Sequence, residues 1–176
     1  MMVNLSPQKQ ALSARVKWVT FSIAGYRLGV SIENVLRVVN CPLELKAQSS
    51  VVELVGIGQH ALTVIDLQSV LRGVASTGSR LSAMPTATSV STSSEFLIVI
   101  KPDVLGNLHN LELCALRVDT PPDLIELDPA SIRQLPTAYR QHHPLRVASQ
   151  VAVLPQGKAT LAIFLLEMNR VLKQLH

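Results

Sequence analysis

The sequence predicts an all-β protein with a barrel-like architecture, in which many short strands are joined by turns and by a few short helices. Apolar residues alternate with other residues on both sides of Gly25, beginning with Val19, Phe21 and Ile23. This period of two indicates a hairpin with one buried face. Short apolar runs then recur between glycine, proline and polar residues, at positions 51–57, 61–65, 96–100, 111–118, 124–127, 147–154 and 159–165. No long helical pattern separates these runs, so alternating βαβ units are not expected.

Short helical segments are predicted where a side chain can accept hydrogen bonds from the exposed amides of a helix start. They are residues 32–36 after Ser31, residues 67–71 after Asp66, and a helix that begins at Asp128-Pro129 and ends at Pro136. The spacing of apolar residues predicts a further helix at the C-terminal end, over residues 166–175. Asp119 ends the apolar run 111–118, where a carboxylate can accept turn amides. We therefore interpret Asp66, Asp119 and Asp128 as structural residues of turns and caps.

The composition indicates a chain that buries a core. Hydrophobic residues make up 48% of the 176 residues and charged residues 16%. Residues 1–16 are polar and basic, and are expected to form a flexible arm. Residues 75–94 contain eleven serines and threonines and no acidic or aromatic residue. Such a segment buries too little surface to offset its ordering entropy, so we expect a flexible insertion that is dispensable for folding.

The basic balance leaves nucleic acid as an alternative partner. The formal net charge is +4, but aromatic residues make up only 3% of the chain, which leaves few platforms for stacked bases. A local cluster of basic residues consists of Arg133, Arg140, His142, His143 and Arg146. Because the cluster lacks a recognised reading element, a basic β-barrel that binds nucleic acid is the second hypothesis.

No constellation of residues points to catalysis, to a metal or to a cofactor. The sequence has no phosphate-binding glycine loop, no nucleophile elbow and no cysteine or histidine pair at metal-ligand spacing. Cys41 and Cys114 each stand in apolar sequence, as small buried side chains do. The longest apolar runs, 96–100 and 161–166, are too short to cross a bilayer, and no secretion signal is apparent. A cytoplasmic protein without direct membrane insertion is therefore expected.

The order of five segments resembles that of a CheW-like domain. The stretch 21–39 is similar to the opening two strands and turn of that family, and Leu62-Thr-Val-Ile-Asp-Leu is similar to its "P-V-I-D-L" strand end. The later resemblances are Cys114-Ala-Leu-Arg-Val-Asp to a "G-L-L-V-D" strand, residues 125–132 to the following short helix, and residues 160–171 to the last strand and chain end. Together they extend over residues 17–173.

The resemblance implies a fold and a role. The fold would be two SH3-like, five-stranded β-barrels within residues 17–176, the first mainly over 17–71 and the second mainly over 95–165, on either side of the insertion. The role would be that of a non-catalytic adaptor. Members of the family link the cytoplasmic tips of methyl-accepting-type receptors to the regulatory domain of a CheA-type histidine kinase, and related copies serve phototaxis or pilus-based motility.

The same resemblance implies a docking surface and shows departures from the family. Val35, Leu36, Arg37 and Val38 correspond to a partner-contacting edge of the first barrel, although the apolar three could equally fill the core. Gly56 and Gly58 are further candidates for partner contact. Gly56-Ile-Gly-Gln59, with Gly56 and Gly58, stands where the family usually has Asn-Leu-Arg-Gly, and Thr63 replaces a proline. Arg37 stands where relatives often have an acid. These departures indicate a divergent single-domain member.

Overall fold

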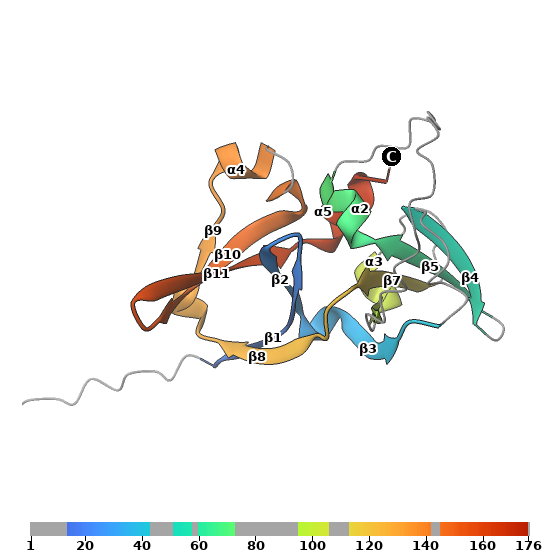
Figure 1. The fold of residues 1–176 in the computed structure, drawn as a ribbon, viewed down its shortest axis with the longest axis horizontal. Helices are drawn as coiled ribbons and strands as arrows, with labels where there is room; N and C mark the ends of the chain where they lie inside the picture. The colour runs from blue at the N-terminus through green and yellow to red at the C-terminus, as the bar shows by residue number, and fades with distance from the viewer. Residues whose placement is uncertain are drawn as a thin grey trace, which may run out of the picture.

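Eleven strands form two sheets in the described part of the chain, which comprises residues 14–42, 51–57, 60–72, 95–105, 113–141 and 145–175 of a computed structural model. Figure 1 shows the two sheets side by side, with the helices α2 and α5 next to each other between them. The predicted fold class, a mostly β protein with a few short helices, is confirmed. No helix among these residues is long and apolar enough to cross a membrane.

The first sheet has six strands in the order β8-β1-β2-β11-β10-β9. Their bounds are β1 Val16–Ile23, β2 Tyr26–Ser31, β8 Asp123–Leu127, β9 Ile132–Gln134, β10 Ala148–Gln156 and β11 Ala159–Leu166. The predicted hairpin is present: β1 and β2 are antiparallel and pair Ile23 with Tyr26 across the Ala24-Gly25 turn. Gly25 has a φ of 82°, in the left-handed region that glycine adopts without a steric penalty. The parallel pairing of β2 with β11 then brings an early and a late strand of the chain into one sheet.

The second sheet has five strands in the order β3-β6-β7-β5-β4. Their bounds are β3 Val35–Asn40, β4 Val52–Ile57, β5 His60–Asp66, β6 Phe96–Ile100 and β7 Leu113–Val118. The central strands β6 and β7 are buried along most of their length, in agreement with their continuous apolar sequence. Strands β3 and β4 lie at the two edges.

Short helices connect and cover the strands. The α-helices are α2 Leu67–Arg72, α3 Pro102–Leu105, α4 Thr137–Gln141 and α5 Met168–Lys173, and the 3₁₀ turns are η1 Ile32–Asn34, η2 Pro129–Ser131 and η3 Leu145–Val147. The prediction of a helix between Asp128 and Pro136 was wrong beyond the first turn. After η2 the chain enters β9, because Ile132 and its neighbours pair with β10.

Three hydrophobic clusters make up the core of the described residues. One lies within each sheet: Trp18, Leu127 and Ile163 belong to the cluster of the first, and Leu62 and Leu97 to that of the second. The largest cluster contains side chains of both sheets, from Phe21 of β1 to Leu116 of β7, together with buried residues of α2 and α5. The sheets therefore share a continuous apolar contact.

Each of the two sheets combines strands from both sides of residues 75–94. The first two strands pair with β8 and β11, whereas all strands from β3 to β7 form the second sheet. Hydrogen bonding between segments distant in the sequence decides this grouping. Residues 75–94 lie outside the described residues, as does the arm except for its end, where Val16 already belongs to β1.

Candidate functional site

The edge strand β3 presents three consecutive exposed side chains. Val35 is buried, whereas Leu36, Arg37 and Val38 face solvent, with 50% of Leu36 and 41% of Val38 accessible. The cause is a register shift, in which Val35 pairs with Ile100 and Arg37 with Val99, so that Leu36 is an extra residue. An extra residue of this kind interrupts the alternation of faces and rotates the side chains that follow. The bulge therefore places two apolar side chains and a cation together on an edge that pairs with no further strand of the described residues.

The other edge strand, β4, alternates regularly and also presents apolar residues outward. Val52 is 41% accessible and Leu54 is 75% accessible, while Glu53 between them is buried. Gly56 of the same strand is exposed, and no atom lies within 4 Å of the position that a Cβ would take there. Gly58 lies outside the described residues. An edge strand offers unpaired backbone donors and acceptors as well as side chains, which makes it a natural place for an added strand or loop of a partner.

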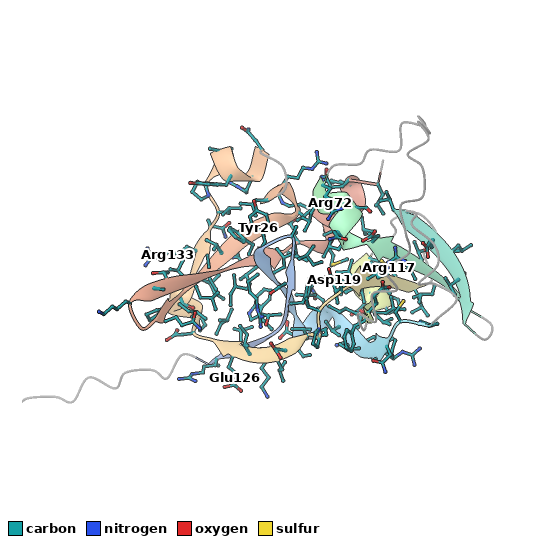
Figure 2. The ribbon with its side chains drawn as sticks, in the orientation of Figure 1. Tyr26, Arg72, Arg117, Asp119, Glu126 and Arg133 are labelled. Atoms are coloured by element: carbon teal, nitrogen blue, oxygen red, sulfur yellow. The ribbon has the colours of Figure 1, made fainter. Side chains whose placement is uncertain are left out.

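Glu53 belongs to a buried cluster of three charged residues that the sequence did not reveal. The Arg117 Nη1 atom on β7 lies 3.4 Å from Glu53 Oε1, and its Nη2 atom lies 3.4 Å from Asp66 Oδ2. Only 10% of the Arg117 side chain and 4% of the Glu53 side chain are accessible. Figure 2 shows Arg117 among the strands of the second sheet. A charge that points inward from an edge strand requires a partner in the core, so this cluster fixes which face of β4 is turned outward.

The three aspartates assigned to turns and caps occupy different surroundings. Asp66 Oδ1 accepts hydrogen bonds from the amides of Gln68 and Ser69 at the start of α2, at 3.0 and 3.4 Å. Asp128 Oδ1 accepts one from the Ala130 amide of η2, at 2.9 Å. Asp119 is exposed at the end of β7. Asp66 thus both caps a helix and pairs with Arg117.

A small cavity of about 120 Å³ lies beside this cluster and is too small for an ordinary ligand. Its lining residues are Ile23, Asp66, Gln68, Glu95, Arg117, Val118 and Asp119. Drug-sized ligands occupy pockets of ~300 Å³ or more. Among the described residues, no three histidine, cysteine or acidic side chains come together in a way that could hold a metal ion. The surface of the edge strands, and not this cavity, is therefore the candidate functional site.

Sequence reasoning missed the charged cluster and the role of β4. The available signal was a charged residue inside each of two apolar runs, Glu53 in 51–57 and Arg117 in 111–118, although the second run also contains Glu112. Such residues can pair with each other, but their separation of 64 positions gives no hint that they do. The exposure of Leu36 and Val38 was left open, because their apolar sequence is also compatible with a core strand.

The comparisons with known proteins rest on structure alone. No protein-family model matches the sequence, and no curated protein matches it. Among solved structures, the fold is similar to the crystal structure of the scaffolding protein TtCheW from Thermoanaerobacter tengcongensis, with a TM-score of 0.54 and 17% sequence identity. The similarity covers 86% of this chain and 89% of that one. The chain therefore has a CheW-like fold.

Proposed function

We propose that the protein is a non-catalytic cytoplasmic adaptor that couples receptors to a CheA-type histidine kinase in chemotaxis, phototaxis or pilus-motility signalling. The observation that carries this proposal is the pair of edge strands on a CheW-like fold, each with exposed apolar residues. The partners would be the regulatory domain of the kinase and the cytoplasmic tip of a methyl-accepting-type receptor. Neither a cofactor nor a metal is required for this role.

The bulged surface of β3, formed by Leu36, Arg37 and Val38, is the proposed docking site. A stable interface buries about 800 Å² on each partner, with an apolar centre and a polar rim. Two exposed apolar side chains would supply part of the centre, and the free backbone of the edge strand would supply hydrogen bonds. Arg37 adds a positive charge, so the facing surface of the cognate partner should be acidic.

Binding to purified partners tests the proposal. We expect a Leu36→Ser/Val38→Ser variant to bind the receptor tip or the kinase regulatory domain at least about tenfold more weakly, because centrally buried apolar anchors dominate interface energies. The matched control is Leu124→Ser/Val153→Ser in the first sheet, where both residues are also exposed, at 59% and 38%. Absence of binding by the unmodified protein to either partner, measured by titration calorimetry, would overturn the adaptor role. Equal losses in the two variants would exclude β3 as the docking site.

Reversal of the charge at Arg37 tests the expected character of the partner. Arg37→Glu should leave stability within about 0.5 kcal/mol, because the residue is exposed. It should weaken the complex at low salt, and the difference should shrink as salt screens the charges. Arg133→Glu, an equal charge change on the exposed face of β9, is the control. Unchanged affinity of Arg37→Glu at low salt would place Arg37 outside the interface.

A further inference from the structure

A basic groove lies at the junction of α4, η3 and α5. It has a volume of about 330 Å³, and four cationic side chains line it: Arg140 of α4, Arg146 of η3, and Arg170 and Lys173 of α5. Two of these residues belong to the basic cluster noted in the sequence, and two come from the C-terminal helix. Arg133, a third member of that cluster, is not a lining residue, and Figure 2 shows it beside β9, the edge strand of the first sheet.

The groove carries an excess of positive charge. Among the described residues that line it, the one carboxylate, Glu167, is paired with Arg170 through a contact of 2.7 Å between Oε2 and Nε. Four cations against this single carboxylate leave an excess of three positive charges. Arg140 donates from Nη2 to the neutral hydroxyl of Thr137, at 3.1 Å. The Nε atoms of Arg140 and Arg146 are shielded from solvent and have no hydrogen-bond acceptor within the described ranges.

Helix stability explains only part of this arrangement. Cations in the last turn of a helix interact favourably with its dipole, which accounts for Arg170 and Lys173. Arg140 and Arg146 also stand in the last turn of their own short elements, α4 and η3, but the dipoles of separate elements do not account for the presence of all four cations around one groove. Cations that line one groove repel one another, and a bound anion would offset this repulsion.

The framework of the groove is held by the core. Three residues of α5, Met168, Val171 and Leu172, are buried in the largest hydrophobic cluster together with Val147 of η3. The Glu167 amide donates a hydrogen bond of 3.0 Å to the Val147 carbonyl, which ties the start of α5 to η3. A framework of this rigidity lowers the cost of ordering the charged side chains when a ligand binds.

We propose that this basic groove binds an acidic segment of a partner protein. Carboxylates pair with arginine in a bidentate geometry, and the groove offers several guanidinium groups to such a segment. Gln141 and Gln174 also line it, and their amides can both donate to and accept from an extended peptide backbone. The lining side chains are all charged or amide groups, without the aromatic platforms that single-stranded nucleic acid uses. The groove belongs to elements other than β3 and β4, so this proposal is independent of the docking site on β3.

Binding of a fluorescein-labelled decaglutamate peptide to the full chain, followed by anisotropy, tests the proposal. We expect binding at about 0.05 M salt that is largely lost at about 0.5 M salt. Lys173→Glu and Arg140→Gln should each weaken it by about fivefold to tenfold, because each removes a cation from a site that depends on charge. Lys173→Glu matches Arg133→Glu in charge change, and the latter should stay within about twofold of the unmodified protein.

Three outcomes would overturn the proposal. The peptide could fail to bind at low salt, or Arg133→Glu could weaken binding as much as Lys173→Glu, which would indicate a response to net charge alone. An oligothymidylate of equal length could bind more tightly than the peptide with the same sensitivity to Lys173→Glu, which would assign the groove to nucleic acid. Should a variant fail to fold, amide shifts in the unmodified protein decide, since decaglutamate should perturb α4, η3 and α5 and leave β9 unchanged.

Discussion

At the scale of single residues, Arg117 has the most demanding surroundings. Its guanidinium group lies in the core of the second sheet between two carboxylates, those of Glu53 and Asp66. The desolvation of three charges is costly, and their mutual attraction offsets it together with the hydrogen bonds that Asp66 accepts. Removal of one member should therefore be more harmful than removal of a pair.

Arg117→Met is expected to lower the free energy of unfolding by about 3 kcal/mol, because it leaves Glu53 buried without its cationic partner. The double variant Arg117→Met/Glu53→Met should recover most of this loss, since it removes both charges and keeps the volume. Urea unfolding of both variants provides the measurement. A double variant that is less stable than Arg117→Met would show that the ion pair itself, and not the avoidance of a lone charge, stabilises the sheet.

Cys114 is a second residue whose properties follow from burial. The side chain is inaccessible, and desolvation raises the pKa of the thiol from 9.0 to about 12. The thiolate is the reactive form, so a thiol with this pKa is inert at neutral pH. With Cys41 replaced by alanine, Cys114 should resist iodoacetamide at pH 8 in the native protein and react in denaturant. Equal rates in the two conditions would contradict its burial.

The same pKa shift predicts a pH dependence of stability. Between pH 9 and about 12 the thiol is ionised in the unfolded state and neutral in the native state. The unfolded state then binds fewer protons than the native state, so Cys114 lowers stability as the pH rises through this window and has no effect below it. Cys114→Ala should therefore lose less stability than the unmodified protein between pH 8 and pH 10.5. Unfolding curves of both proteins at the two pH values measure this difference.

At the scale of elements, an aspartate caps both α2 and η2, but the surroundings of the two carboxylates differ. Asp66 accepts two backbone amides and also lies beside Arg117, whereas Asp128 accepts one amide in an exposed turn. Loss of a cap costs about 1 kcal/mol. Asp128→Ala should cost this amount or less, while Asp66→Ala should cost more, because it also removes a carboxylate from the buried cluster. Equal losses in chemical denaturation would show that the contact with Arg117 contributes nothing.

The start of β3 was predicted to be helical, but it forms a strand because it pairs with β6. Its first residues, Val35 and Leu36, were expected in a helical turn after Ser31. The helical turn is limited to η1. At its start the Glu33 amide donates a hydrogen bond of 3.3 Å to the Ser31 hydroxyl. From Val35 onward the chain pairs with β6 instead. Pairing with β6 satisfies backbone groups of residues 35–40 that a short isolated helical turn would leave to solvent.

At the scale of the whole molecule, the shared core predicts cooperative unfolding. The largest hydrophobic cluster contains residues of both sheets and of α2 and α5, so each sheet would lose a large part of its buried surface without the other. The single tryptophan, Trp18, reports on the first sheet, and Cys41 and Cys114 report on the second. Loss of native tryptophan fluorescence and gain of thiol reactivity should share one urea midpoint. Exposure of the thiols at a lower concentration would show that the second sheet unfolds separately.

Local physical chemistry explains what the sequence by itself determined. The β class, the hairpin at Gly25, the run 96–100 that became β6, and the caps at Asp66 and Asp128 each depend on residues within a few positions of one another. The period of two, the conformation of glycine and the reach of an aspartate side chain are properties of a short segment. They hold wherever that segment lies in the fold.

Only the tertiary structure decided which segments meet. The parallel pairing of β2 with β11, the contact of Glu53 with Arg117, and the convergence of Arg140 with Lys173 each join residues more than thirty positions apart. The bulge that exposes Leu36 exists only because β3 pairs with β6. Hydrogen bonds between strands and the burial of charge act through space, and one sequence does not record which of its distant segments are neighbours.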